Sequence, residues 1–194
     1  MERVIEKAKK YVKKFSANES TGHDYHHAMR VYNMALYLSV GKDVDLDVIA
    51  LAALLHDLDD KKIAVESSRL ALDFLEEHVS EFIKFEVIDI IENMSFSDQK
   101  QGKKITSLEG KIVQDADRLD ALGAIGIARV FAYSGKKNHL IYNDVINDDS
   151  AIAHFYQKLL GLDALMNTVE ARIIAERRIE YMKTYLEEFF KEWR

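Results

Sequence analysis

Apolar residues recur every three or four positions along most of the chain, which is the spacing of amphipathic helices. The pattern is clear at the start, where apolar residues alternate with lysines. Asp24 stands where a side chain could cap the second helix. The pattern predicts helices over residues 2–17, 24–39, 45–57, 66–78, 80–94, 107–131 with a continuation or restart after Gly123, 150–160 and 168–192.

Between these helices the sequence offers two long polar stretches and almost no strand signal. Residues 95–104 and 134–150 are expected to be loops, with a short hairpin over 139–146 as the alternative within the second. No repeat or linker interrupts the chain, so we predict a single all-α domain over residues 1–194. The apolar side of the last helix is expected to carry Ile173, Ile174, Ile179, Met182, Leu186 and Phe189.

The composition supports a folded helical protein. The 194 residues are 48% hydrophobic and 31% charged and include no proline, which permits long uninterrupted helices. No apolar run approaches the ~20 residues needed to cross a bilayer, and the first residues lack the apolar core of a signal peptide. We therefore expect a cytoplasmic protein.

The charge and the absence of cysteine narrow the function. A formal net charge of −6 argues against a nucleic-acid partner but is compatible with a pocket for a small anionic substrate. We expect no membrane partner, and the sequence is compatible with a homo-oligomer. With no cysteine, any metal ion would be held by His, Asp or Glu.

The segment "LLHDLDDKK" ends an apolar helix on His56 and Asp57. One interpretation is a helix end that becomes solvated. The other is half of a metal site, because burying His56 without a partner would cost ~1–3 kcal/mol. Adjacent side chains on a helix diverge by ~100°. Both could therefore reach one ion only from a helix end or by approaching the ion from different sides. Asp59 is expected to be merely solvated.

Two other segments carry candidate ligands. In "GHDYHHAMRV" the spacing places His23, His27 and Arg30 on one helix face, and a solvated helix start is the alternative. In "VQDADRLDALGA" three aspartates, Asp115, Asp117 and Asp120, repel one another with only Arg118 nearby. A metal ion or a salt-bridged surface helix would each resolve that repulsion.

Together these segments resemble the HD-domain superfamily of metal-dependent phosphohydrolases. "GHDYHHAMRV" is similar to the family's GHDxxHxxRV form, and "DADRLDALGAIGIAR" to its DADxLDAxGAxGIxR helix. The ending "HFYQKLLGLDALMNTVEARIIAERR" is similar to the tail of a bacterial subgroup of small single-domain members. The resemblance covers nearly the whole chain and implies a helical bundle of the HD-domain type.

The resemblance also implies a metal site. Its ligands would be His27, His56, Asp57 and Asp117, and Asp115 and Asp120 would orient a histidine ligand or Arg118. Two imidazoles and two carboxylates suit one divalent ion, with Mn²⁺ favoured and Mg²⁺, Co²⁺, Ni²⁺ or Fe²⁺ as alternatives.

The implied reaction is hydrolysis of a phosphoester or phosphoanhydride bond by a metal-activated water, with a nucleotide as the expected substrate. Asp60 resembles the family's acidic residue after the His-Asp doublet, here His56 and Asp57, and would position the water or act as general acid or base. The residues expected to contact substrate are His23, Lys61, Arg118, His154 and Lys158.

Two other classes compete with this hypothesis. One is a catalytically inactive or regulatory nucleotide-binding HD module, although all four ligands are present. The other is a dinuclear-iron oxygenase or two-metal phosphodiesterase, which would need further histidines between Asp57 and Asp117. Only His78 lies in that interval, so the sequence favours a mononuclear hydrolase.

Overall fold

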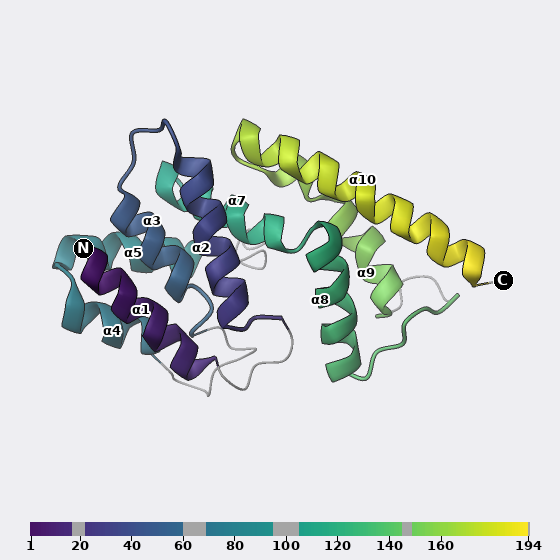
Figure 1. Ribbon diagram of the computed structural model, residues 1–194, viewed down its shortest axis with the longest axis horizontal. Helices are drawn as coiled ribbons and strands as arrows, with labels where there is room; N and C mark the ends of the chain where they lie inside the picture. The colour runs from purple at the N-terminus through teal and green to yellow at the C-terminus, as the bar shows by residue number, and fades with distance from the viewer. Residues whose placement is uncertain (17–21, 60–68, 95–104, 145–148, 194) are drawn as a thin grey trace. The chain divides into compact units, whose positions relative to one another are not determined.

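The structure is a computed structural model that describes residues 1–16, 22–59, 69–94, 105–144 and 149–193 (Figure 1). Within these ranges the chain forms nine α-helices and two short 3-10 helices, and no described residue is in a β-strand. The all-α prediction is therefore confirmed. The chain folds into two compact units, one of Met1–Glu19 with His23–Asp117 and one of Ser20–Gly22 with Arg118–Arg194. A single domain over residues 1–194 stays a prediction.

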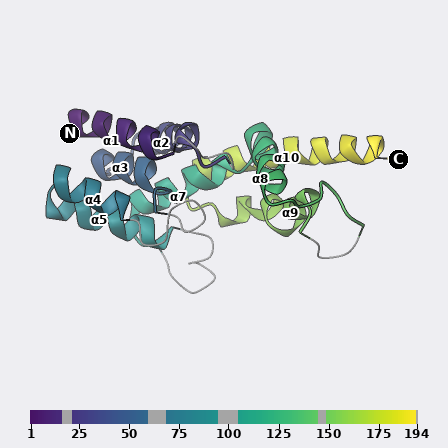
Figure 2. The ribbon, with the colours of Figure 1, turned by 90° about the horizontal axis from the view of Figure 1, so that it is seen from below.

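The first unit is built around a helix that is apolar on all sides. Its helices are α1 (Glu2–Phe15), α2 (Tyr25–Ser39), α3 (Leu46–Leu55), α4 (Leu70–His78), α5 (Glu81–Asn93) and all but the end of α7 (Leu108–Asp120). Every residue of α3 from Val48 to Leu55 is buried. Because it has no polar face, α3 belongs in the middle of the bundle. It packs against α1, α2 and α5, and Figure 2 shows it between the α1 and α2 pair and the α4 and α5 pair.

Two aspartates begin the helices that lead to the histidines. The side chain of Asp24 accepts a hydrogen bond from the backbone N–H of His27 at 2.8 Å, which confirms it as the cap of α2. Asp45 accepts from the N–H groups of Asp47 and Val48 at 2.9 and 3.1 Å and starts α3. These caps fix the residue at which each helix starts.

Helix α7 is tied to the same unit by side chains on its inner face. The Glu109 carboxylate accepts from the backbone N–H of Asp45 at 3.0 Å, and Gln114 Nε2 donates to the carbonyl of Met94, just after α5, at 2.9 Å. Gly110 permits the close approach, since a Cβ there would lie 3.2 Å from Ile90 Cγ1 of α5. This anchoring sets the position of Asp117, which lies less than one turn beyond Gln114.

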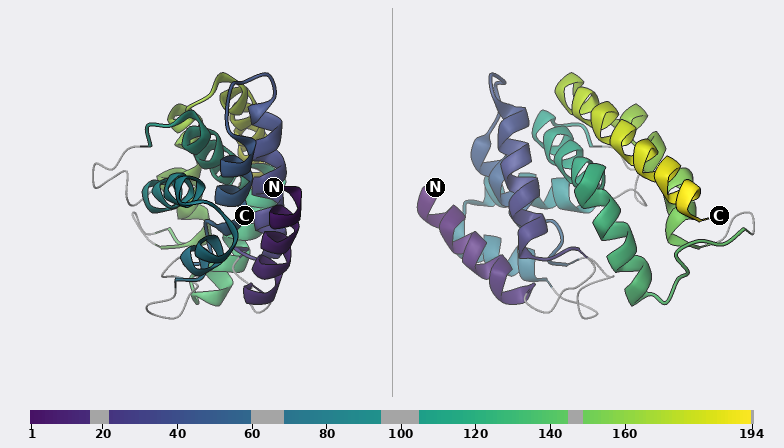
Figure 3. Two further views of the ribbon diagram at one scale, coloured as in Figure 1. Left: turned by 90° about the vertical axis from the view of Figure 1, so that its left-hand side faces the viewer. Right: turned by 45° about the vertical axis from the view of Figure 1, so that its right-hand side comes forward.

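The second unit contains α8 (Gly123–Lys136), α9 (Ala151–Gln157), the short helices η1 (Leu159–Gly161) and η2 (Asp163–Leu165), and the long α10 (Val169–Glu192). Helix α10 packs against α8 and both short helices, as the right-hand view of Figure 3 illustrates for α8. Gly123 has a φ of +73°, a conformation that glycine adopts without strain, and this resolves the predicted continuation or restart as a restart.

The apolar side of α10 differs from the prediction at one position. The buried residues are Ala171, Ala175, Ile179, Met182 and Leu186. Ile173 is 62% exposed, so its assignment to the apolar side was wrong. On a helix with ~100° per residue, Ile173 lies almost opposite the centre of that stripe, and two small alanines take the inner positions instead.

The remaining differences concern element ends. The predicted loop at 134–150 begins later, because α8 continues to Lys136. Among its described residues there is no hairpin, although the carbonyls of Leu140 and Ile141 accept from the N–H groups of Ala151 and Ile152 at 2.9 and 3.0 Å. The predicted helix at 150–160 divides into α9 and η1. No helix in the described part of the chain is long and apolar enough to cross a membrane.

Candidate metal centre

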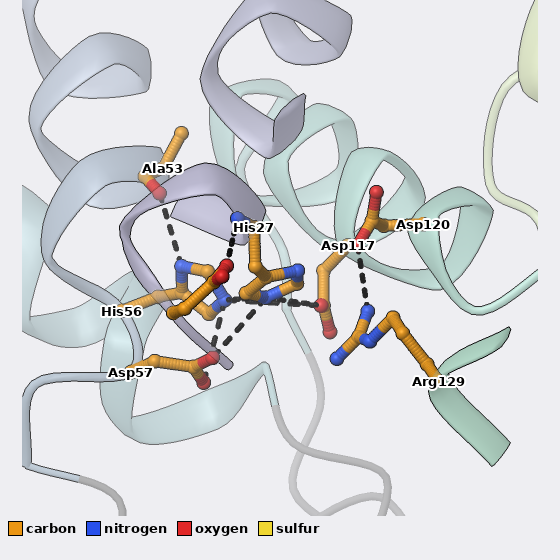
Figure 4. Close-up of polar contacts among 8 residues, drawn as sticks. His27, Ala53, His56, Asp57, Asp117, Asp120 and Arg129 are labelled. Carbon is orange, nitrogen blue, oxygen red and sulfur yellow. Dashed lines mark hydrogen bonds and ion pairs between the residues drawn. The ribbon is translucent and has the colours of Figure 1, made fainter. Parts of the chain in front are cut away.

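Three of the predicted ligands meet in the first unit. His27 comes from the first turns of α2, and His56 and Asp57 follow the last residue of α3 (Figure 4). Each offers one potential ligand atom, and these atoms all lie within 4.8 Å of one another. The Nε2 atoms of the two histidines face each other at 3.2 Å.

The two carboxylates add further potential metal-ligand atoms around the same point. Asp57 Oδ2 lies 3.1 Å from His27 Nε2, and Asp57 Oδ1 lies 3.4 Å from His56 Nε2. Asp117 Oδ1, from α7, is 3.5 and 3.7 Å from the Nε2 atoms of His27 and His56. Neighbouring ligands at right angles around an ion, each about 2.1 Å from it, would be about 3.0 Å apart. The observed distances between the histidine nitrogens and the carboxylate oxygens are close to that value.

The end of α3 explains how adjacent residues can both reach this point. The helix stops at Leu55, and the backbone N–H of Leu58 donates to the carbonyl of Leu55 at 3.1 Å in a turn. Within a continuing helix the side chains of His56 and Asp57 would diverge by ~100°. At this helix end both side chains reach His27, whose Nε2 lies 3.2 Å from His56 Nε2 and 3.1 Å from Asp57 Oδ2.

A second hydrogen bond sets the tautomer of His56. Its Nδ1 lies 3.0 Å from the carbonyl oxygen of Ala53, which can only accept, so Nδ1 must carry a proton. In the neutral ring the lone pair is then on Nε2, the atom that faces His27 and the carboxylates. A backbone carbonyl behind a histidine is the usual way in which a metal-ligating imidazole is oriented.

The two histidine side chains are more deeply buried than the two carboxylates. The side chains of His27 and His56 are 0% and 3% exposed, whereas those of Asp57 and Asp117 are 20% and 37% exposed. The imidazoles therefore form the inner wall of the group, and a ligand from solution would approach from the carboxylate side.

The charges of the four groups are strongly coupled. Burial alone would lower the pKa of His56, but the negative charges of Asp57 and Asp117 outweigh it and raise this pKa to about 9. Burial alone would raise the pKa values of the two carboxyls, but the nearby histidines, His56 foremost, lower both. The group is thus built to hold positive charge between two carboxylates.

One atom of this group lacks a hydrogen bond. Asp57 Oδ2 is buried and has no hydrogen-bond partner among the described residues, while His27 Nε2 lies 3.1 Å from it as an ion-pair contact. Leaving a buried oxygen unsatisfied costs ~1–3 kcal/mol, and more for a charged group. A divalent cation would satisfy it, and two imidazole nitrogens with two carboxylates fit such an ion.

The other predicted site residues are distributed more widely. The ring of His23 is half-buried and lies edge-on to His27 with 5.5 Å between ring centres. Asp60 and Lys61 lie outside the described residues. Arg118 belongs to the second unit, where its buried guanidinium donates to the carbonyl of Leu165.

His154 and Lys158 also belong to the second unit. His154 is the fourth residue of α9, and Lys158 follows the end of that helix. Burial, with a smaller contribution from the positive charge of Lys158, lowers the pKa of His154. The expected contacts of these residues with substrate stay predictions.

Two acidic residues have roles that sequence reasoning missed. Asp59 is not merely solvated: its two oxygens accept from the N–H groups of Leu70 and Ala71 at 2.8 and 2.9 Å, at the start of α4. Asp120 forms a 2.7 Å ion pair with Arg129 of α8, whereas the sequence pointed only to Arg118 as a nearby cation. Both partners are nine or more residues away, and no local signal identifies them.

Comparisons with known proteins agree with this geometry. The HD domain family model matches residues 24–122, a span that includes His27, His56, Asp57 and Asp117. The chain belongs to the HD-domain superfamily of hydrolases.

Several relatives match almost the whole chain. Bacillus subtilis YpgQ is 42% identical over 96% of this chain and 92% of its own, and the structure of YpgQ in complex with ADP has a TM-score of 0.79 over 97% of both chains. An HD-superfamily hydrolase from Bacillus thuringiensis is 45% identical, with a TM-score of 0.79 over 99% of this chain and 97% of that one. A Lactobacillus plantarum protein is 35% identical, with a TM-score of 0.89 over 100% and 98% of the two chains.

Proposed function

We propose that this protein is a metal-dependent phosphohydrolase that hydrolyses a phosphoester or phosphoanhydride bond of a nucleotide. The observation that carries the proposal is the convergence of His27 Nε2, His56 Nε2 and two carboxylates around a buried oxygen without a hydrogen bond, Asp57 Oδ2. The complex of YpgQ with ADP supports a nucleotide as the ligand class.

The proposed ligands are His27, His56, Asp57 and Asp117, holding one divalent ion. The ion would lower the pKa of a bound water and offset negative charge on the phosphoryl oxygens. Two imidazoles make a pure Mg²⁺ preference less natural, so Mn²⁺ is the favoured ion for assays. Asp117, the most exposed of the four, would face the incoming substrate.

Each of the remaining roles follows from side-chain chemistry. Asp60 would position the attacking water or exchange its proton. Lys61 would attract substrate phosphate as a point charge, and Arg118 would bind it with a planar fork. His23 would contact phosphate or orient His27, and His154 and Lys158 would contact substrate.

The mononuclear form of the site is favoured over a dinuclear one. The sequence has only His78 between Asp57 and Asp117. In α4 its ring stacks on Phe74 with 4.5 Å between ring centres, and its Nδ1 donates to the Phe74 carbonyl at 2.9 Å. These contacts within α4 account for His78 as a packing residue, and no other histidine of that interval could serve a second ion.

The deciding experiment is a substrate panel assayed with Mn²⁺. It would include nucleoside mono-, di- and triphosphates, pyrophosphate-containing metabolites and simple phosphomonoesters, with orthophosphate and pyrophosphate release scored separately. We expect release from one nucleotide class, abolished by a chelator and restored by added Mn²⁺. Equal rates on all compounds would refute the nucleotide assignment. Binding of nucleotide and Mn²⁺ without any release would favour the regulatory module.

A further inference from the structure

The carboxylate of Asp59 caps the N-terminus of α4, which begins eleven residues further along the chain. Its Oδ1 accepts from the N–H of Leu70 at 2.8 Å and its Oδ2 accepts from the N–H of Ala71 at 2.9 Å. The residue that precedes α4, Arg69, makes no capping hydrogen bond with its side chain. Asp59 therefore does for α4 what a capping residue normally does from within the same turn.

This contact fixes the backbone on the C-terminal side of Asp57, which we call its far side. On the near side, the Leu58 to Leu55 hydrogen bond joins the segment to the end of α3. On the far side, Asp59 joins it to α4, which is secured by the buried side chains of Phe74 and Leu75. Helix α4 packs on α5, and α5 packs on α3, so residues 56–59 are held between two helices of one packed group.

Asp57 depends on this backbone support because its side chain is poorly anchored. Its Oδ2 is buried without a hydrogen bond from any described residue. An oxygen without a hydrogen bond takes its position from the Cα of its own residue and from the cation that it faces. A small shift of the backbone would therefore move Asp57 away from His27 and His56.

We propose that Asp59 is a positioning residue for the metal centre: by binding the first two amides of α4, it holds the Asp57 carboxylate against the two histidines. The inference rests on the proposed function, because it takes a divalent ion as the group for which Asp57 is held. Coupling is reciprocal, so a bound ion must in turn stabilise the contact between Asp59 and the first turn of α4.

The test compares Asp59 with a matched aspartate. Asp45 also accepts two backbone N–H groups at a helix start, but at the opposite end of α3 from the doublet. Mn²⁺ alone is titrated by calorimetry into the full-length wild type, Asp59→Ala, Asp59→Asn and Asp45→Ala. We expect both alanine variants to unfold at a lower temperature, but only Asp59→Ala to bind Mn²⁺ about 10–100-fold more weakly. Asp59→Asn keeps one acceptor oxygen and is expected to be intermediate.

The measurements distinguish a failure of the proposed function from a failure of the positioning role of Asp59. If the wild type does not bind Mn²⁺, or if His56→Ala binds it as well as the wild type, the proposed function fails. If the wild type binds Mn²⁺ through His56 and Asp59→Ala binds it equally well, or if Asp45→Ala loses as much affinity as Asp59→Ala, the positioning role of Asp59 is overturned.

A second measurement needs no variant and covers the case in which Asp59→Ala does not fold. Amide hydrogen exchange of Leu70 and Ala71 is followed in the wild type with and without Mn²⁺. We expect exchange at these two amides to slow at least severalfold when Mn²⁺ binds, with little change at Asp47 and Val48, the amides capped by Asp45. Equal protection of Leu70 and Ala71 in both states contradicts the inference.

Discussion

The Nε2 atoms of His27 and His56 face each other at 3.2 Å, although the two residues are 29 positions apart and come from different helices. Two lone pairs would repel at this distance, so a proton or a cation must lie between the rings. A proton on one ring makes a hydrogen bond, and a divalent ion would use both lone pairs. Protons and metal ions therefore compete for the same space in this group.

The first prediction concerns His56 itself. His56→Ala removes a ligand and leaves Asp57 beside a void, so we expect Mn²⁺ affinity and kcat/KM each to fall by more than about 100-fold, beyond the ~10–100-fold cost of losing a group that merely supports a ligand. The measurements are calorimetric titration and steady-state kinetics on the best nucleotide of the panel. His78→Ala is the matched control, because His78 also donates from Nδ1 to a backbone carbonyl. Undiminished activity in His56→Ala would remove the proposed mechanism.

The second prediction is a pH dependence with opposite signs for the metal-free and metal-bound protein. In the metal-free protein the pKa of His56 is raised from 6.5 to about 9. Its protonated form thus stabilises the folded state below pH 6.5 by up to about 3 kcal/mol, and this contribution is lost as the pH rises to 9. Mn²⁺ needs the unprotonated ring, so its apparent affinity should rise over the same interval.

The corresponding measurement is thermal unfolding between pH 6 and pH 9, with a chelator or with saturating Mn²⁺. The variant His56→Gln cannot titrate at this position and supplies the reference. The unfolding temperature of the metal-free wild type should fall with pH relative to that of His56→Gln. Parallel profiles for the two proteins would show that His56 does not hold a proton as described.

A third prediction tests the ion pair between Asp120 and Arg129 in the second unit. The two side chains are 6% and 15% exposed and lie 2.7 Å apart. Asp120→Asn removes the negative charge of this pair beside a largely buried guanidinium, so we expect a loss of about 3 kcal/mol in urea unfolding. Glu188→Gln breaks an exposed pair with Lys191 and should cost less than about 0.5 kcal/mol. Equal effects would mean that burial does not strengthen the inner pair.

The fourth prediction contrasts two glycines of α8. A Cβ on Gly126 would lie 2.2 Å from the carbonyl oxygen of Ala121, a backbone atom that cannot move aside. Gly126→Ala should therefore destabilise the protein by about 2–3 kcal/mol. A Cβ on Gly135 meets nothing within 4 Å, and Gly135→Ala should stabilise the helix by about 0.5–1 kcal/mol. The free energies of unfolding of both variants are measured in urea. An unchanged free energy of unfolding for Gly126→Ala would contradict the close contact with Ala121.

Much of the local structure follows from the sequence because its causes are local. The 3.6-residue period of apolar positions predicts the helices, and the short polar side chain of Asp24 predicts the start of α2. The apolar run before His56 predicts a buried helix that ends at the doublet, and α3 ends one residue before it. The resemblance of the three motifs to the HD family also selected Asp117 from three neighbouring aspartates.

Only the tertiary structure decides what each of those side chains meets, because partners depend on how helices rotate and pack. Asp115 is fully buried, Asp117 faces the histidines and Asp120 pairs with Arg129, although all three lie within six residues. Asp59 finds its partners eleven and twelve residues away, at the start of a different helix. The sequence by itself determined the helices and the chemical types available for a metal site, and the packing of α2, α3 and α7 decided which atoms face one another, since a helix sets its own periodicity but not its neighbours.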